Sequence, residues 1–428
     1  MEILLLFGLL ITYVFMGIPV AVCIGLAALT TMIAADMGIP FSLVPNQLFS
    51  GMNSFTLMAI PFFILAGEMM NRAGLTIRIL NLAEAIVGHI RGGLAHVNIL
   101  ASMLMAGVSG SGAADTAAVG SAMIPTMQEK GFKSNFAVVV TATSSTVGPI
   151  IPPSVLFILY GFLTNASVGK LFLGGVFPGI LMGLGLMITS YIICLKEGYE
   201  KSHEKFESRR LWRTGKEGVA ALLIPIVIVG SISTGVATAT ESGVIAVLIA
   251  LILGLAFRTL TKKGVLRDAV VNSTYTTSII FLILATSAIF SNILVRSQFQ
   301  LFVIDTLESI TSSPTVSILL IILFIFIMGM FVDVTPILIM FAAPLSEVGT
   351  QLGFDPTFFG VIMVIAAMIG SVTPPVGGLL LISTSIGQIP ISDTFKILIP
   401  FVVTLIIILL IVTFIPQLVT FLPNAIMG

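Results

Sequence analysis

The chain has 428 residues, of which 57% are apolar and only 9% are charged, whereas a typical soluble protein carries roughly 25% charged residues. Its mean hydropathy of +1.16 predicts an integral membrane protein. The 19 basic and 19 acidic side chains balance, so the chain lacks the basic field that nucleic acid requires, and we exclude nucleic-acid binding.

Apolar runs long enough to cross a lipid bilayer follow one another along nearly the whole chain, since a spanning helix needs roughly 20 apolar residues. They cover residues 3–35, 54–70, 94–129, 134–163, 171–195, 218–257, 274–294, 315–346, 358–386 and 397–421. The opening run starts at Ile3 and is too long for the core of a signal peptide, so we expect a retained membrane helix. Runs 3–35 and 218–257 exceed one span, and we divide them at 17–19 and at 235–241.

The runs 94–129 and 315–346 are also long, but polar clusters with glycine interrupt them at 109–116 and 329–336. Irregular backbone is not tolerated against lipid, so each cluster must be buried in protein or face a water-filled cavity. We interpret each run as a re-entrant helical hairpin with its tip inside the membrane. The alternative is a pair of full spans joined by a polar loop, and both interpretations return the chain to its starting side.

Two further runs, 134–163 and 358–386, are broken at equivalent places. Each break contains a glycine followed by two prolines: Gly148, Pro152 and Pro153 in the first, and Gly370, Pro374 and Pro375 in the second. Proline removes a backbone donor and glycine admits unusual dihedral angles, so each stretch should unwind. The carbonyl end of a half-helix suits a cation and the N–H end suits an anion. One such break is equally typical of a structural kink, but two beside polar hairpins favour a binding site.

The basic residues set the orientation, because cytoplasmic loops collect Lys and Arg. With the N-terminus outside, only Lys170 and Arg296 of the 19 cations lie on the outer side. We therefore expect both termini in the periplasm. The stretch 196–217, with seven cations and five glutamates, is expected to be a cytoplasmic linker.

This linker separates two halves, 1–195 and 218–428, which resemble each other weakly but in register, as the halves of many transporters do. At an offset of 218, Asp115 matches Asp333, and at an offset of 222 the two breaks match. Each half has five spanning helices and one hairpin, an odd number of crossings, so the repeats should be inverted. We predict an all-α integral membrane protein of the elevator type, with two inverted repeats and a broken helix in each.

Asp115 and Asp333 are the strongest single candidates for functional residues, because a carboxylate near the bilayer centre costs roughly 2.5–3.5 kcal/mol on insertion scales. Hard oxygen ligands suit a hard cation, which favours sodium coordination. Asp115 is equally well explained as a cap of the returning hairpin helix, whereas the apolar setting of Asp333 favours a ligand. Glu68 and Glu241 lie near span ends, where a solvated position explains both.

Cysteine and histidine give no sign of a reaction centre. Cys23 and Cys194 lie in apolar runs, as small buried side chains do, and the three histidines have no partners at metal-ligand spacing. We therefore expect neither an enzyme nor a cofactor.

Six motifs stand in a fixed order along the chain, at 59–67, 109–117, 148–154, 238–241, 329–336 and 370–375. Their order, their spacing and the total length together resemble the large membrane subunit of tripartite ATP-independent periplasmic (TRAP) transporters. The resemblance implies import of an organic acid, of the C4-dicarboxylate or sialic acid type, across the bacterial cytoplasmic (inner) membrane. It implies sodium as the coupling ion, a periplasmic substrate-binding protein as donor, and a separate small four-helix membrane subunit as partner.

The resemblance also implies two sodium sites, each between a hairpin tip and a broken helix. The sodium ligands predicted in this way are Ser109, Gly110, Ser111, Asp115 and Gly148 for one site, and Asp333, Gly370 and Thr373 for the other. The predicted substrate-binding residues are Thr116, Pro152, Pro153, Ser154, Thr335, Pro374 and Pro375. We expect the hairpins and broken helices to move as one transport unit against a scaffold, linked to it by arms at 71–92 and 296–310.

The nearest alternative is a stand-alone carboxylate symporter, coupled to sodium or protons, that needs no binding protein. An ion channel is disfavoured because the chain has no repeated rings of charged residues. Neither the organic acid nor the number of sodium ions follows from the sequence.

Overall fold

The computed structural model describes residues 2–199 and 207–428, and the side chains of residues 108, 109, 217 and 219–221 lie outside the described part. Every regular element in the described residues is a helix. The all-helical class predicted from the sequence is therefore confirmed. The predicted sodium ligand Ser109 is one of the residues whose side chain is not described.

The helices before residue 200 include a helix pair at the predicted hairpin and an interrupted helix at the predicted break. They are α1 (Glu2–Phe15), α2 (Val20–Ala34), α3 (Leu43–Met52), the 3-10 helix η1 (Thr56–Met58), α4 (Ala59–Arg72), α5 (Leu75–Val87), α6 (Gly93–Ser109), α7 (Gly112–Glu129), α8 (Ser134–Ser144), α9 (Val155–Thr164) and α10 (Val168–Lys196).

The helices after residue 206 repeat the same features. They are α11 (Ser208–Ser233), α12 (Ala239–Ala256), α13 (Val265–Arg296), α14 (Phe299–Ile310), α15 (Pro314–Phe331), α16 (Val334–Gln351), α17 (Pro356–Gly370), α18 (Gly378–Gly387), the 3-10 helix η2 (Ile391–Thr394), α19 (Phe395–Phe414) and α20 (Gln417–Met427).

Most of the predicted boundaries lie where the helices end. The run 3–35 is divided between α1 and α2, and the run 218–257 between α11 and α12, at the predicted glycines. Four boundaries differ. Helix α13 begins at Val265, nine residues before the predicted run 274–294, and α16 ends at Gln351, five residues after the predicted run 315–346. The predicted final span 397–421 ends at Phe414, because Pro416 cannot continue the hydrogen-bonding pattern of α19. Helix α11 begins at Ser208, so the second part of the predicted linker is helical.

Several helices are long and apolar enough to cross a membrane. In the described residues these are α10, α12, α13, α15 and the segment Ile391–Phe414 that joins η2 to α19. Helix α3 together with η1 and α4 is apolar enough as a pair bent by 56°, which is either a broken span or a re-entrant loop. Other predicted spans consist of apolar helices of 10–17 residues, because glycine and proline interrupt them. The full prediction of five spans in each half therefore goes beyond what these helix lengths establish.

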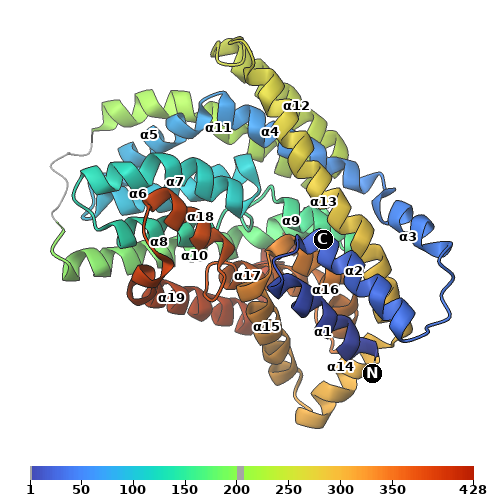
Figure 1. Cartoon of the computed structure of the whole chain (residues 1–428). Helices are drawn as coiled ribbons and strands as arrows, with labels where there is room; N and C mark the ends of the chain where they lie inside the picture. Colours follow the sequence, from blue (N-terminus) through green and yellow to red (C-terminus); the bar gives the residue numbers. More distant parts are fainter. Residues whose placement is uncertain (1, 200–206) are drawn as a thin grey trace.

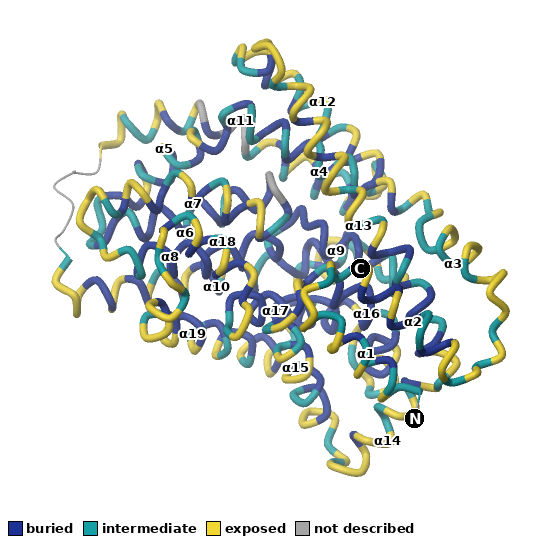
Figure 2. Tube along the Cα trace, viewed as in Figure 1, coloured by how far each residue is buried: buried dark blue, intermediate teal, exposed yellow. Residues whose placement is uncertain are grey.

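The core lies where the two groups of helices meet. Figure 1 shows α6, α7, α8, α18 and α10 gathered on one side and α1, α2, α3 and α14 on the other, with α9, α16 and α17 between them. Figure 2 shows buried residues concentrated around α9, α16 and α17, and exposed residues along α12 and α3. Helix α17 is buried along its whole length after Pro356, as expected for a helix that is apolar on all sides.

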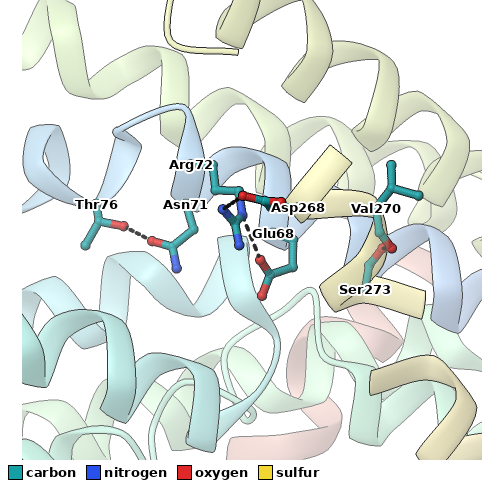
Figure 3. Close-up of polar contacts among 7 residues, drawn as sticks. All are labelled: Glu68, Asn71, Arg72, Thr76, Asp268, Val270 and Ser273. Atoms are coloured by element: carbon teal, nitrogen blue, oxygen red, sulfur yellow. Dashed lines mark hydrogen bonds and ion pairs between the residues drawn. The ribbon is translucent and has the colours of Figure 1, made fainter. Parts of the chain in front are cut away.

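The corner between α4 and α5 is fixed to α13 by polar contacts (Figure 3). Arg72 at the end of α4 lies 3.4 Å from Glu68 and 3.8 Å from Asp268, the latter in the first turn of α13. Asn71 accepts a hydrogen bond from the hydroxyl of Thr76 across the corner. Glu68 is therefore part of an ion pair at the end of its helix.

Candidate functional site

The first predicted hairpin has a tip of two residues. Helix α6 ends at Ser109 and α7 begins at Gly112, which leaves Gly110 with a φ of +57° and Ser111 in an extended conformation. A Cβ atom on Gly110 would lie 3.4 Å from the carbonyl oxygen of Pro153. The first tip therefore lies directly against the first break.

The second predicted hairpin is joined to the second break by hydrogen bonds. Helix α15 ends at Phe331, and the carbonyl of Met330 accepts from the backbone N–H groups of Val376 at 3.1 Å and Gly377 at 3.4 Å. Asp333 is the N-cap of α16, and its Oδ1 accepts from the N–H of Val334 at 2.9 Å.

Both predicted breaks are present. The first separates α8 from α9 between Ser144 and Val155, and the second separates α17 from α18 between Gly370 and Gly378. Each contains a cis peptide bond between its two prolines. The hydroxyl of Ser154 caps the helix after the first break by accepting from the N–H of Phe157 at 3.3 Å.

Both tips and both breaks converge on one cavity of about 70 Å³. Its walls come from the first tip (Gly110, Ser111, Gly112, Ala113), the second tip (Asp333, Val334, Thr335), the first break (Pro149, Val155, Leu156), the second break (Met368, Ser371, Leu379) and the helices α4 and α13 (Ile64, Thr276, Ile280). The sequence prediction that the two tips meet is therefore matched by this cavity.

Four helices begin at this cavity. Its wall includes first-turn residues of α7, α9, α16 and α18. The N–H groups of a first helical turn have no partner within the helix, and they carry the positive end of the helix dipole. None of the residues named in the wall is basic. Two of these N–H groups are already bonded, that of Val334 to Asp333 and that of Leu379 to the carbonyl of Ser371. The remaining first-turn N–H groups are the positive element of this site, and they suit an anion.

Only part of the predicted site lines the cavity. Gly110, Ser111, Asp333 and Thr335 do so. The predicted residues outside its wall are Asp115, Thr116, Gly148, Pro152, Pro153, Ser154, Gly370, Thr373, Pro374 and Pro375. Thr116 is fully buried and donates to the carbonyl of Gly112 at 2.8 Å, and Thr373 donates to the carbonyl of Ile369 at 2.7 Å. Both hydroxyls thus have a local partner.

Asp115 lies behind the first tip and outside the wall of the cavity, among buried polar groups that we call the Asp115 chamber. Its side chain has 0% exposure, and among the described residues neither carboxylate oxygen has a hydrogen-bond partner. A Cβ atom on Gly148 would lie 3.8 Å from Oδ2 of Asp115, and the hydroxyl groups of Ser102 and Ser145 adjoin the carboxylate. Gly112 and Gly148 adjoin this chamber, and a Cβ atom on them would lie 3.1 Å and 3.6 Å, respectively, from the carbonyl oxygen of Ser145.

The structure distinguishes the two interpretations of Asp115 that the sequence left open, and it adds a capping role to Asp333. Asp115 was equally a candidate cap and a candidate ligand; its side chain accepts no N–H from the described backbone, because α7 begins three residues earlier, at Gly112. Asp333 does cap its helix. Its second oxygen, Oδ2, is not used by the cap, and the residue also lines the cavity.

Comparison with known proteins identifies the family. Residues 7–418 match the family described as "Tripartite ATP-independent periplasmic transporter, DctM component". The chain belongs to this family. Members of the DctM family are transport permeases and not enzymes, so the expectation that this chain is not an enzyme is confirmed.

Two relatives show how fully the chain matches other TRAP permeases. It is 37% identical over 416 residues to the sialic acid TRAP transporter large permease protein SiaM of Vibrio cholerae, covering 97% of this chain and 96% of that protein. It is 34% identical over 411 residues to the isethionate TRAP transporter permease protein DctMQ of Oleidesulfovibrio alaskensis, covering 96% of this chain and 65% of that protein.

A solved structure shares the fold of this DctM chain. The crystal structure of the Alcanivorax borkumensis YdaH transporter superposes with a TM-score of 0.61 over 87% of each chain, at 11% sequence identity. The likeness supports the predicted transporter fold and carries no information on substrate.

Gly370 has a packing role that the sequence did not indicate. A Cβ atom there would lie 2.5 Å from the carbonyl oxygen of Phe326 and 2.6 Å from the Cα of Gly329. The two glycines let α15 and α17 cross in direct backbone contact, so neither tolerates a side chain without movement of a helix.

The residues that α4 and α13 contribute to the cavity wall of this DctM chain were not among the predicted site residues. Ile64 was within a recognised motif but had no assigned role, and Thr276 and Ile280 lie in an apolar span. A threonine in such a span is a weak signal, because its hydroxyl can bond to its own helix. Ser102 and Ser145 beside Asp115 were missed for the same reason.

Proposed function

We propose that this DctM permease imports an organic-acid anion into the bacterial cell by sodium-coupled secondary transport. The observation that carries the proposal is the convergence of four helix N-termini on one cavity between the two tips and the two breaks. These N–H groups bind an anionic group of the substrate without a basic side chain. The substrates named for the two relatives, sialic acid and isethionate, are both organic acids.

Sodium travels as cargo beside the substrate in this proposal. The chamber around Asp115 fits the ion chemically, because it combines a carboxylate without a partner among the described residues, two hydroxyl groups and a carbonyl, all of them hard oxygen ligands. Asp333, whose Oδ2 lies outside the cap contact, serves the second site with the backbone of the second break. Each sodium moving inward gains about 2.3 kcal/mol per 100 mV, and a tenfold gradient adds about 1.4 kcal/mol.

The transport unit in this proposal consists of α6–α9 and α15–α18. Residues 1–195 and 218–428 form inverted repeats, with the tips entering from opposite faces. Equivalent backbone supports the repeat: Gly131 and Gly353, which match at an offset of 222, have the same φ of +85°. Helices α5 and α14, which lie in the predicted arms 71–92 and 296–310, link the unit to the scaffold. Movement of the unit past the scaffold gives alternating access.

Two protein partners complete the proposed transporter, a periplasmic binding protein and a small four-helix membrane subunit. The isethionate relative, named DctMQ, supports the small subunit, since this chain covers only 65% of its length. The remaining length is room for a second component joined to the permease.

Reconstituted uptake tests the proposal. Proteoliposomes containing the chain and its small subunit are given an inward sodium gradient and periplasmic binding proteins loaded with radiolabelled sialic acid, succinate or isethionate. We expect accumulation of one of these anions only when both the gradient and the binding protein are present. Accumulation without any binding protein would support the stand-alone symporter, and accumulation without sodium would exclude sodium coupling.

The proposed orientation places both termini in the periplasm of a bacterial inner membrane and residues 196–217 in the cytoplasm. Glu207 is exposed immediately before α11. In a background with Cys23 and Cys194 replaced by alanine, Glu207→Cys in intact cells should resist an impermeant maleimide and react after the membrane is permeabilised. Labelling from the outer face would reverse the orientation.

A further inference from the structure

Helix α11 carries a basic and aromatic face at its N-terminal end that has no part in the site above. Trp212, the only tryptophan of the chain, is 70% exposed. Arg209, Arg213 and Lys216 are exposed beside it, and the ammonium of Lys216 lies 5.2 Å from the indole ring. At about 100° per residue these four side chains fall within an arc of about 100° on the helix surface.

The opposite side of α11 is held against α5, which fixes the direction of this face. Arg210 donates to the carboxylate of Glu84 at 2.6 Å, and a Cβ atom on Gly218 would lie 2.8 Å from the side chain of Leu82. Thr214, between them on the same side, is buried. The face of Trp212 therefore points away from the protein.

The same stripe continues along α11 as a lipid-facing surface. Leu223 is 49% exposed, Ile226 is 66% exposed and Val227 is 37% exposed. They lie 14 residues after Arg209, Trp212 and Arg213 respectively, which is about four helical turns and returns to the same side of the helix. An apolar stripe that ends in tryptophan and cations is typical of a helix that leaves the hydrocarbon core and enters the headgroup layer.

The length of α11 places Trp212 at that boundary. From Ser233, where α11 ends before the turn to α12, back to Trp212 is about 32 Å at 1.5 Å per residue, and the hydrocarbon core is about 30 Å thick. The indole thus lies at the edge of the core and Arg209 lies beyond it. Arg213 and Lys216 start slightly nearer to Ser233, and their long side chains extend outward to the level of the lipid phosphates.

We propose that this face, formed by Arg209, Trp212, Arg213 and Lys216, is a binding site for the headgroup of an anionic phospholipid. The occupant follows from charge complementarity, because three cations point outward while Arg210 is paired with Glu84. Two glutamates flank this face in the sequence, Glu207, exposed at the N-cap, and Glu217, which follows Lys216, so the three outward cations outnumber the acidic residues next to them by one. A phosphatidylglycerol headgroup carries a negative charge that would pair with these cations, whereas phosphatidylcholine is neutral overall.

The single tryptophan makes the proposal measurable. The full-length chain is reconstituted in phosphatidylcholine vesicles that contain a small fraction of lipid brominated on the acyl chains, either phosphatidylglycerol or phosphatidylcholine, and quenching of Trp212 fluorescence is compared. We expect brominated phosphatidylglycerol to quench with a relative association constant about fivefold above that of brominated phosphatidylcholine at low salt. The preference should fall towards one in 0.5 M salt.

Matched triple variants identify the residues responsible. Arg209→Gln/Arg213→Gln/Lys216→Gln should lose the preference but keep quenching by both lipids, since Trp212 remains at the edge of the core. Lys262→Gln/Lys263→Gln/Arg267→Gln removes the same charge from the exposed turn between α12 and α13 and from the first turn of α13, and it should keep the preference. Equal quenching by the two lipids in the wild type would overturn the proposal. So would the absence of quenching by either lipid, because Trp212 would then face water or another protein.

Discussion

Asp333→Asn is expected to reduce sodium-dependent uptake at least tenfold while leaving the permease folded. A tenfold reduction in the uptake rate corresponds to about 1.4 kcal/mol. The carboxylate lines the cavity and uses one oxygen, Oδ1, to cap α16. Asparagine caps a helix about as well as aspartate, so the variant keeps the cap and removes only the charge. Uptake is measured in the reconstituted system at a series of sodium concentrations.

Asp305→Asn is the matched control for Asp333→Asn. Asp305 is exposed on α14, and its variant should transport within twofold of the wild type. Unchanged sodium dependence in Asp333→Asn would remove this carboxylate from the coupling mechanism. Loss of the monodisperse peak on size-exclusion chromatography would show that the effect is on folding, and Asp333→Ser, which retains a capping oxygen, would then separate charge from cap.

The positions of the tips and breaks could be predicted from the sequence because glycine and proline determine them through their local backbone preferences. The prolines at 152 and 153 and the glycine at 110 restrict or free the dihedral angles of their own residues, whatever surrounds them. The helices accordingly end near the predicted places. Local backbone preferences of this kind also explain the predicted division of the opening run between α1 and α2.

The walls of the cavity could not be predicted in this way. Thr276 and Ile280 reach the cavity only because α13 packs beside the tips. In the sequence, an apolar residue of a spanning helix that faces lipid cannot be told from one that faces protein or a cavity. Contacts between distant elements decide such roles, and a single sequence does not record them.

The two aspartates show where the internal repeat fails as a guide. They match at an offset of 218, yet α7 begins three residues before Asp115, whereas α16 begins directly after Asp333. This shift of a helix start turns one carboxylate into a buried group without a partner in the described chain and the other into a cap at the cavity. The two proposed sodium sites therefore differ in chemistry.

Asp115→Asn is expected to remove at least half of the stabilisation that sodium gives to the wild type. A ligand present at 100 times its dissociation constant stabilises the folded state by about 2.7 kcal/mol, which is several degrees in melting temperature for a protein of this size. Without sodium, the buried carboxylate is a cost, because a charge away from water needs a partner. In potassium at equal ionic strength, the neutral variant should therefore melt at or above the wild-type temperature.

The matched control for this measurement is Asp355→Asn. Asp355 is an exposed N-cap of α17 that accepts from Phe358 at 2.9 Å, and asparagine preserves such a cap, so the full sodium increment should remain. The double variant Asp115→Asn/Asp333→Asn should lose the increment entirely, because both proposed ion sites are then neutral. A full sodium increment in Asp115→Asn would exclude the buried chamber as an ion site, since nothing else in it supplies a charge to hold the cation.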